Sequence, residues 1–430
     1  MSLVEEKKDW KVLKAEAMAH LHRLYFDETD DRPWAVAWSG GKDSTTVLGL
    51  IVEFLESLPP ERRHREVYAV MSDTKMENPN LEAYMHNQVS LLNDYAEKKE
   101  LPIQADLVFR KEEHDFFYLV MGRGYFLPQR IGRGRWCTQR LKLFPQNERL
   151  KEIQPSHMLV GTRLDESQTR RESMEKWSAD DEFNARMGEH AQISTITTFM
   201  PIANWSVEDV WAYLTLNGLG WSSSVEVRTL YKDATGECGF SNPKGVEKNT
   251  VEACGARFGC WTCPVVMKDQ STEKMSETYE WMQPLAEWRK LQLMVFGDYI
   301  PKRPEGMTKK ERGTQLRKWE AIMADVKLIT KSGHKRNGNI MKDKHTGEHR
   351  LDQGTITVEA RKYLFDKLME TEQLVNRMRE LENLPPLELV REETKELIKE
   401  QWEHDEKEAP WLVSNESGRS IKELDEILDM

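Results

Sequence analysis

Long apolar runs are absent from this sequence. A membrane-spanning helix needs about 20 consecutive apolar residues, whereas one of the longest apolar runs, residues 46–55, is already interrupted by Gly49 and Glu53. The first residues turn acidic at Glu5 and do not have the pattern of a secretion signal. We therefore expect a cytoplasmic protein that makes no contact with membranes.

Cysteine is also scarce, with five residues at irregular spacing in a chain of 430. In a chain that shows no secretion signal, this pattern is not that of a disulfide framework. The cysteines are therefore expected to be reduced thiols, metal ligands or redox-active groups.

An overall excess of basic residues is absent too. The net charge is −11, so the molecule as a whole does not attract nucleic acid electrostatically. Contact with a polyanion must be local or made through a partner. Hydrophobic residues make up 39% and charged residues 31% of the chain, which indicates a globular protein, and its length exceeds one typical core.

Short apolar strands alternate with helices in the first half of the chain. After a charged helix over residues 5–28, the periodicities predict strand 35–38, helix 45–58, strand 67–71, helix 81–98, strand 105–109 and strand 158–162. This order is typical of an α/β fold with an open parallel sheet covered by helices on both faces. In such sheets, ligands bind at the carboxyl ends of the strands.

The second half has a different pattern. Ser206 is predicted to cap a helix over residues 207–216, residues 222–270 are predicted to be irregular, and residues 355–430 are predicted to be helical with an acidic end. We divide the chain into an N-terminal helix, an α/β domain, a cysteine-rich region and a C-terminal helical region that is first basic and then acidic. The bounds are 1–30, 31–220, 221–300 and 301–430.

A glycine loop follows the first predicted strand and consists of Ser39, Gly40, Gly41, Lys42, Asp43 and Ser44. Two glycines allow successive backbone N–H groups to point at one anion, and the helix that opens at Ser44 adds its positive N-terminal end. Lys42 adds positive charge, whereas Asp43 is better suited to holding magnesium or organising the loop. The spacing is not that of a Walker A motif. An ordinary turn between a strand and a helix is the alternative interpretation.

Asp73 and Arg163 lie just past two further predicted strands, at the sheet edge where the glycine loop is expected. Arg163 is followed by Arg170 and Arg171, and a guanidinium group suits phosphate oxygens well. We therefore expect phosphate or DNA contact, with a solvated helix start and incidental salt bridges as the alternative. Asp73, with Glu77 one turn later, is as well suited to capping the helix that follows as to holding a ligand.

Three of the cysteines lie close together in the sequence. Cys260 and Cys263 form a Cys-x-x-Cys pair, and Cys254 precedes them by six residues. This spacing lets the sulfurs face one metal ion or cluster. Cys137 and Cys238 are both candidates for the fourth ligand. A zinc site with the same ligands and unligated core thiols are the alternatives.

One segment departs from the acidic balance of the chain. Residues 302–350 contain fourteen Lys and Arg against six Asp and Glu. Because its aromatic content is limited to Trp319, the segment is suited to contact a nucleic-acid backbone rather than to stack bases. A solvated helix face is the alternative. We expect this segment to make local contact with DNA.

The glycine loop resembles the signature of the ATP pyrophosphatase (PP-loop) superfamily. Further motifs resemble its PAPS-reductase branch and follow that family's order: Asp73-Thr74, Glu77 to Pro79, Gly161 to Ser167 with Arg170, Pro201-Ile202, Trp205-Ser206 and Asp209 to Trp211. The resemblance runs from about residue 33 to residue 215. It implies that ATP is cleaved between its α and β phosphates, with magnesium as a cofactor. The residues implied beside the nucleotide are those of the loop together with Asp73, Gly161, Arg163 and Arg170.

Beyond residue 215, the sequence resembles the DndC family, the sulfurtransferases of bacterial DNA phosphorothioation, and its single-strand counterpart, the SspD family. The motifs are Tyr231 to Asp233, Gly236 to Cys238, Cys254 with Arg257 to Cys263, and Leu351 to Thr357. The resemblance implies a 4Fe-4S cluster. Its implied ligands are Cys137, Cys254, Cys260 and Cys263, which leaves Cys238 free to carry sulfur.

The same resemblance implies a reaction. ATP activates a DNA backbone phosphate by adenylation, and sulfur from a cysteine desulfurase then enters, with Lys42, Asp43 and Cys238 as the catalytic residues. Other proteins of the phosphorothioation system are the expected partners. A PAPS or adenylyl sulfate reductase and a tRNA-thiolating enzyme are the enzymatic alternatives. A non-catalytic scaffold with a structural metal is the alternative of another class.

Overall fold

The computed structural model describes residues 8–128, 134–164, 186–235, 259–265, 270–304 and 306–428. Three residues of the expected sites, Arg170, Cys238 and Cys254, lie outside the described residues. The chain forms two compact units. Residues 1–109 and 142–258 belong to the first unit, and residues 110–141 and 259–430 belong to the second.

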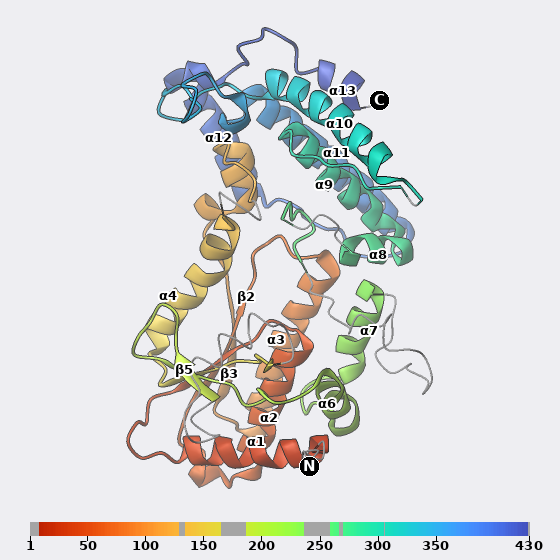
Figure 1. Ribbon diagram of the computed structural model, residues 1–430. Helices are drawn as coiled ribbons and strands as arrows, with labels where there is room; N and C mark the ends of the chain where they lie inside the picture. Colours follow the sequence, from red (N-terminus) through yellow and green to blue (C-terminus); the bar gives the residue numbers. More distant parts are fainter. Residues whose placement is uncertain are drawn as a thin grey trace, which may run out of the picture. The chain divides into compact units, whose positions relative to one another are not determined.

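The first unit is built on one six-stranded sheet (Figure 1). Its strands are β1 (Trp34–Ala37), β2 (Val67–Ser72), β3 (Ile103–Val108), β4 (His157–Leu159), β5 (Met187–Glu189) and β6 (Thr197–Phe199). The strand order is β3-β2-β1-β4-β6-β5, and all neighbours run parallel except β5 and β6. The predicted α/β class with an open, mostly parallel sheet is therefore confirmed.

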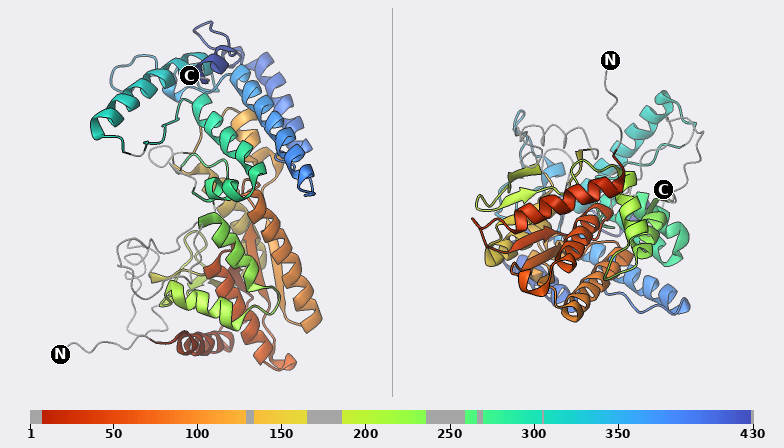
Figure 2. Two further views of the ribbon diagram at one scale, coloured as in Figure 1. Left: turned by 90° about the vertical axis from the view of Figure 1, so that its right-hand side faces the viewer. Right: turned by 90° about the horizontal axis from the view of Figure 1, so that it is seen from below.

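Helices cover both faces of this sheet, as predicted. They are α1 (Trp10–Tyr25), α2 (Lys42–Ser57), α3 (Pro79–Lys99), α4 (Phe144–Ile153), α6 (Val207–Ala212) and α7 (Ser224–Thr235). In Figure 1 the strands lie between α4 on one side and α2 and α3 on the other. Right-handed crossovers between parallel strands produce this arrangement. The second view in Figure 2 shows α1 packed beside α2.

The core of the first unit lies where α2 packs against β1. Trp34, Ala35 and Val36 of β1 have no exposed surface, and α2 buries most of its residues from Lys42 to Leu55. A parallel strand and the helix that follows it are covered on both faces here, so both are almost continuously apolar. This buried pair places the loop that joins them at the carboxyl edge of the sheet.

The prediction that residues 222–270 are irregular is wrong for their first part, which forms α7. Val227, Leu230 and Tyr231 of this helix are buried at the spacing of three and four residues that marks one helical face. The pattern is short and lies next to a run of serines, which favours a turn when only local sequence is considered.

The other predicted strands and helices of the first unit are confirmed to within a few residues. The predicted helix over residues 207–216 begins after Ser206, whose hydroxyl accepts a hydrogen bond from the N–H of Asp209 (3.2 Å). It runs as α6 and continues as a π-helical segment, Tyr213–Asn217. The capping prediction is therefore confirmed as well.

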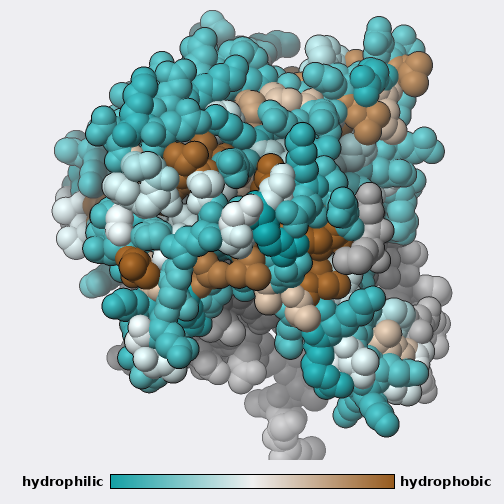
Figure 3. All heavy atoms as spheres, turned by 90° about the horizontal axis from the view of Figure 1, so that it is seen from above, coloured by the Kyte–Doolittle hydropathy of each residue, from teal (hydrophilic) through white to brown (hydrophobic). Residues whose placement is uncertain are grey.

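The second unit is helical, which confirms the prediction for residues 355–430. Its helices are α8 (Gln270–Thr278), α9 (Gln283–Val295), α10 (Lys309–Thr330), α11 (Val358–Leu381), α12 (Glu392–Glu408) and α13 (Glu423–Leu428). The face shown in Figure 3 is mostly hydrophilic, with apolar side chains in several separate areas. Within the described parts of the chain, no helix is long and apolar enough to cross a membrane.

A buried ion network joins elements of the second unit. Asp405 of α12 has no exposed surface. Arg336 donates hydrogen bonds to both oxygens of its carboxylate (2.6 and 2.7 Å), and Arg361 of α11 donates to one of them (2.9 Å). Burial lowers the pKa of Arg361 to about 10, although the negative charge of Asp405 opposes this. The network holds α11, α12 and the loop after α10 together.

His157, the first residue of β4, makes the stability of the first unit depend on pH. Burial lowers its pKa to about 4, below the value near 6.5 of an unfolded histidine. The unfolded chain therefore binds a proton first, and stability that is complete above pH 6.5 is lost as the pH falls toward 4. For a partly buried group we expect a loss of roughly 1–2 kcal/mol between pH 7 and pH 5.

Urea unfolding of His157→Gln at pH 7 and pH 5 tests this expectation. The variant is expected to lose less stability than the wild type over this interval. His345→Gln replaces an exposed histidine and is the matched control, expected to behave as the wild type. An unchanged pH dependence in His157→Gln would mean that another group causes the loss.

Candidate functional site

The glycine loop connects β1 to α2. Gly40 has a φ of 71°, a left-handed conformation that side chains disfavour, and a Cβ at this position would lie 3.2 Å from the ring of Tyr84. Gly41 is the N-cap residue of α2, and no side chain caps the helix there. The first-turn N–H groups of α2 are therefore placed as an anion site requires.

Hydroxyl groups close the loop on itself. The N–H of Ser39 donates to the hydroxyl of Ser44 (3.1 Å), and the two hydroxyls lie 3.1 Å apart. The hydroxyl of Ser44 donates in turn to the carbonyl of Gly41 (3.1 Å). These bonds hold the two ends of the loop together and give it a defined shape before any ligand binds.

Asp43 organises the loop through two cations. Its Oδ2 lies 3.0 Å from the ammonium of Lys42, and its Oδ1 accepts a hydrogen bond from Nε of Arg163 (2.6 Å). Arg163 is only 2% exposed and also donates to the carbonyl of Trp205 (3.3 Å). Of the two roles expected for Asp43, the geometry favours loop organiser over magnesium ligand. Arg163 therefore contacts the loop through the carboxylate of Asp43.

Gly161 follows β4 and lies directly against the loop. A Cβ at this position would lie 2.7 Å from the carbonyl carbon of Asp43 and 2.7 Å from the backbone nitrogen of Ser44. Real side chains do not approach backbone atoms so closely, so only glycine fits here. The structure thus brings Arg163 to the loop, two parts that the sequence placed at one edge of the sheet, and it also brings Gly161 there, which the family resemblance implied.

Tyr231 of α7 also contacts the loop. Its hydroxyl accepts a hydrogen bond from the N–H of Lys42 (3.2 Å), and the Lys42 ammonium lies 5.2 Å from the centre of its ring. One of the N–H groups expected to face an anion is thus already hydrogen-bonded to this hydroxyl oxygen. Tyr231 is recognisable in the sequence only as part of a motif, because a contact across 189 residues leaves no local signal.

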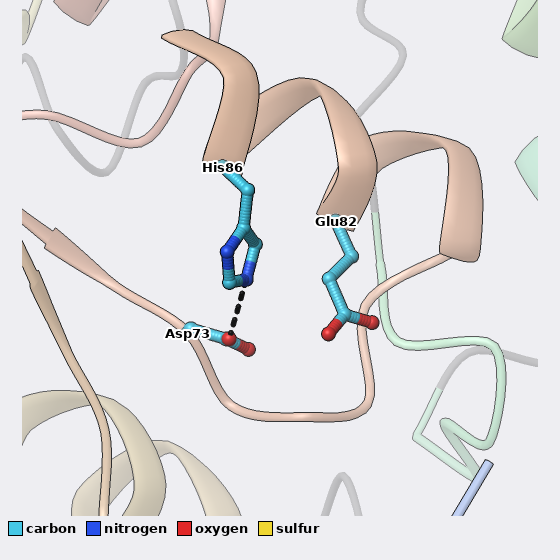
Figure 4. A group of neighbouring side chains, drawn as sticks. All are labelled: Asp73, Glu82 and His86. Atoms are coloured by element: carbon cyan, nitrogen blue, oxygen red, sulfur yellow. Dashed lines mark hydrogen bonds and ion pairs between the residues drawn. The ribbon is translucent and has the colours of Figure 1, made fainter. Parts of the chain in front are cut away.

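Asp73 directly follows β2 and is 1% exposed. Its Oδ1 accepts a hydrogen bond from the N–H of Lys75 (2.8 Å), and its Oδ2 forms an ion pair with the Lys75 ammonium. Nε2 of His86 lies 3.2 Å from the same Oδ2 (Figure 4). Asp73 therefore belongs to a cluster of charged groups between β2 and α3. Lys75 and His86 were not predicted as site residues, although His86 follows Glu82 by one helical turn.

Glu77 and Asn78 order the turn before α3. Glu77 accepts hydrogen bonds from the N–H (3.0 Å) and the hydroxyl (2.7 Å) of Thr74, and burial raises the pKa of its carboxyl group. Asn78 is the N-cap residue of α3 and accepts a hydrogen bond from the N–H of Asn80 (3.0 Å). The capping role considered for Asp73 and Glu77 thus belongs to Asn78.

Three of the five cysteines lie in the described part of the second unit. Cys137, Cys260 and Cys263 are half-buried and form no disulfide. Burial raises the pKa of the Cys137 thiol, and the neighbouring Cys263 raises it further. Cys137 and Cys263 are thus close enough to interact although 126 positions separate them. Cysteine sulfur is a ligand that a 4Fe-4S cluster or a zinc ion takes, and Cys137 and Cys263 are the two of these cysteines that the structure shows interacting.

The Cys-x-x-Cys turn is held firmly by α9. The N–H of Cys263 donates to the carbonyl of Cys260 (2.9 Å), and Arg289 of α9 donates to the carbonyl of Cys263 (2.8 Å). Trp261 between the two cysteines is 3% exposed, with its ring centroid 5.3 Å from that of Trp288. A turn fixed by packing on one side is suited to present its sulfurs to a bound group.

The basic segment 302–350 divides into exposed and buried parts. Arg336 is bound to Asp405, and Lys331 is 3% exposed, so these two residues are not part of a surface for DNA. The exposed lysines and arginines are Lys302, Arg303, Lys309, Lys310, Arg317, Lys318, Lys335, Lys342 and Lys344. A run of charges in the sequence does not reveal which members pair with a distant residue.

A family model gives the clearest comparison with known proteins. The model described as the phosphoadenosine phosphosulfate reductase domain matches residues 33–266, more than half of the chain. The match includes the whole sheet, the glycine loop and the Cys-x-x-Cys pair. No curated protein matches the chain.

Several solved structures are similar to parts of this chain at low identity and low TM-score. The phosphoadenylyl-sulfate (PAPS) reductase from Candida auris has 14% identity, covering 51% of this chain and 90% of its own, with a TM-score of 0.30. The U34-tRNA thiolase NcsA from Methanococcus maripaludis, solved with its [4Fe-4S] cluster, has 11% identity, with coverages of 81% and 90% and a TM-score of 0.33. The FMN adenylyltransferase from Candida glabrata, in complex with FAD and inorganic pyrophosphate, has 12% identity, with coverages of 64% and 77% and a TM-score of 0.32. Likenesses at this level carry no argument about what this chain binds.

Proposed function

Because this chain belongs to the phosphoadenosine phosphosulfate reductase domain family, we propose that it is an ATP-dependent sulfurtransferase that installs sulfur in the DNA backbone as a phosphorothioate. A non-bridging oxygen of a DNA phosphate attacks the α-phosphorus of ATP, and pyrophosphate leaves. A sulfur nucleophile then attacks the activated DNA phosphorus, and AMP leaves with the oxygen that it gained.

The sulfur balance requires a persulfide and a second thiol. A cysteine desulfurase supplies the persulfide. Because the four cysteines other than Cys238 are the proposed cluster ligands, a low-molecular-weight thiol from solution attacks the inner sulfur of the persulfide, which releases hydrosulfide and leaves a mixed disulfide that a second such thiol reduces. Hydrosulfide is the nucleophile that displaces AMP. Cys238 is the proposed carrier of the persulfide on this chain.

The observation that carries the nucleotide half of this proposal is the loop of the first unit. The N-cap residue Gly41 has no side chain to cap the first turn of α2, where only the N–H of Lys42 is shown bonded to a side chain, the hydroxyl of Tyr231. Ser39 and Ser44 hold the loop closed, and Gly161 packs on its backbone. Such a shaped, positively polarised loop is suited to hold a leaving pyrophosphate with magnesium. Binding of the leaving group lowers the barrier without any covalent role for the loop.

The sulfur half rests on the cysteine centre of the second unit. Cys137, Cys260 and Cys263, together with Cys254, are the proposed ligands of a 4Fe-4S cluster, which would supply the redox or sulfur-handling chemistry when bound. The chain contributes the four thiolates and the packed turn that presents two of them. A zinc ion takes the same ligands, so metal analysis of anaerobically prepared protein distinguishes the two groups.

DNA is the proposed substrate because exposed basic side chains gather within residues 302–350 of an otherwise acidic chain. The exposed lysines of α10 and the following loop are suited to phosphate contacts, which position a duplex without recognising its sequence. Other phosphorothioation proteins are the proposed partners that choose the site.

The test is mass spectrometry of nuclease-digested DNA from cells that carry the pathway. Phosphorothioate dinucleotides are expected with the wild-type protein and are expected to be lost on its deletion and in Lys42→Ala. Lys407→Ala, an exposed lysine of α12, is the matched control and is expected to keep them. Dinucleotides that persist in the deletion strain would end the proposal. Sulfur found in tRNA instead would favour a tRNA thiolase, and sulfite released from PAPS by the purified protein would favour a reductase.

A further inference from the structure

Three metal-ligating side chains converge between β2 and α3 of the first unit (Figure 4). Asp73 stands at the end of β2, and Glu82 and His86 stand four residues apart on α3, which places them on one face of the helix. One ligand atom from each residue lies within 4.8 Å of the other two. Two carboxylates and an imidazole face one small volume, and Asp73 is almost fully buried there.

A lysine side chain already brings a positive charge to this volume. The ammonium of Lys75 forms an ion pair with Asp73 and lies 4.0 Å from Oε1 of Glu82. Lys75 has a φ of 61°, a conformation that costs a residue other than glycine on the order of 1–3 kcal/mol. The turn after β2 thus bends back sharply and puts a cation between the two carboxylates.

We propose that Asp73, Glu82 and His86 form a divalent-cation site and that Lys75 is a built-in cation that competes with the metal. When the ion binds, the Lys75 ammonium leaves the carboxylates, and when the ion dissociates, it returns. The lysine keeps the buried Asp73 neutralised in the absence of metal, so an empty site does not leave an uncompensated charge.

The donor set selects the class of metal. Two carboxylate oxygens and one imidazole nitrogen suit a first-row divalent cation such as Mn²⁺, whereas Mg²⁺ and Ca²⁺ prefer oxygen ligands alone. Three protein ligands leave coordination positions open for water or phosphate oxygens. Asp43, the other candidate for a metal in this unit, has both oxygens engaged by Lys42 and Arg163.

The site adjoins the glycine loop through α3. Tyr84, between Glu82 and His86 in the sequence, lies on the opposite face of the helix and packs beside Gly40. A metal that orders the first turns of α3 would therefore also restrict the movement of Tyr84, which packs against the loop. Binding of the metal does not require the proposed DNA reaction, and the inference stands or fails without it.

Mn²⁺ is the probe, because it binds carboxylates and imidazole and has little preference for the thiolates of the second unit. The full-length protein without nucleotide is titrated with Mn²⁺ and followed by electron paramagnetic resonance. We expect one site in the first unit, with nitrogen coupling from His86. Lys75→Met, which keeps a long side chain without its charge, is expected to bind Mn²⁺ about 10-fold more tightly.

Removal of a ligand is expected to have the opposite effect. Glu82→Gln and His86→Ala are expected to weaken Mn²⁺ binding by about 10-fold or more, and His86→Ala also loses the nitrogen coupling. Lys98→Met, near the other end of α3, is the matched control and is expected to bind as the wild type. Equal affinity in Lys75→Met and the wild type, nitrogen coupling that survives in His86→Ala, or no Mn²⁺ binding in any variant overturns the proposal. Circular dichroism confirms that each variant is folded. These outcomes do not depend on whether phosphorothioates are found in cellular DNA. Failure of the cation site can therefore be distinguished from failure of the proposed function.

Discussion

Gly161→Ala is expected to lower the proposed ATP-dependent activity by on the order of 100-fold, because the new methyl group displaces the glycine loop. The Cβ would lie 2.7 Å from backbone atoms of both Asp43 and Ser44. Backbone atoms cannot rotate away as a side chain does, so either the loop or the segment after β4 must shift. Asp43 carries the contacts to Lys42 and Arg163, and such a shift disturbs all of them at once.

Two measurements on the purified protein separate this effect from general unfolding. ATP affinity is measured by calorimetric titration, and the melting temperature is recorded alongside it. Gly313→Ala is the matched control, because the nearest atom to its Cβ is a flexible Arg317 nitrogen at 3.7 Å. The control lies within α10 and is expected to stabilise that helix by about 1 kcal/mol and to leave ATP affinity unchanged. A folded Gly161→Ala with wild-type ATP affinity would show that the loop is not the nucleotide site.

The sheet was predictable because its central strands are buried on both faces. The residues of β1 and β2 are apolar almost without interruption, and α2, the α-helix between them, is buried over most of its length. β5 and β6 were not predicted. Each is only three residues long, so its strand conformation depends on pairing with a neighbour rather than on its own sequence.

The loop was predictable for a different reason. Glycines, a lysine and hydroxyls in a short segment after a strand have few structural purposes other than holding an anion. The contacts that shape the loop come from elsewhere in the chain, and these could not be predicted. Tyr231 and Arg163 reach it from 189 and 120 positions away, and sequence spacing alone does not tell which distant residue folds back onto which.

The proposed divalent-cation site combines residues that sequence spacing could indicate with residues that it could not. Glu82 and His86 have the spacing of one helical turn, a signal that the sequence contains. Asp73 joins them because the short turn after β2 leads into α3, and the competing Lys75 joins because its backbone turns back. In the second unit, Arg336 belongs by sequence to a basic surface, yet its guanidinium is bound to Asp405, which lies 69 positions later.

Substitution of Asp405 is expected to have the largest effect on the stability of the second unit. Asp405→Ala is expected to lower the unfolding free energy of the second unit by about 3–5 kcal/mol, because it leaves a buried charge unpaired. Arg361 has no exposed surface, and its remaining partners in the fold, the carbonyls of Gly122 and Thr357, are neutral. Arg336, bound to both carboxylate oxygens in the folded unit, loses its ion pair in the same step.

Urea unfolding followed by circular dichroism measures this effect, with the neighbouring residue as control. Glu406 pairs with Lys362 on the exposed side of α12, and Glu406→Ala is expected to cost less than about 1 kcal/mol. A triple variant in which Asp405, Arg361 and Arg336 all become apolar is expected to recover most of the loss, because no unpaired charge remains inside. If Asp405→Ala and Glu406→Ala cost the same, the carboxylate does not hold the unit together. If the triple variant is no more stable than Asp405→Ala, packing rather than the unpaired charge causes the loss.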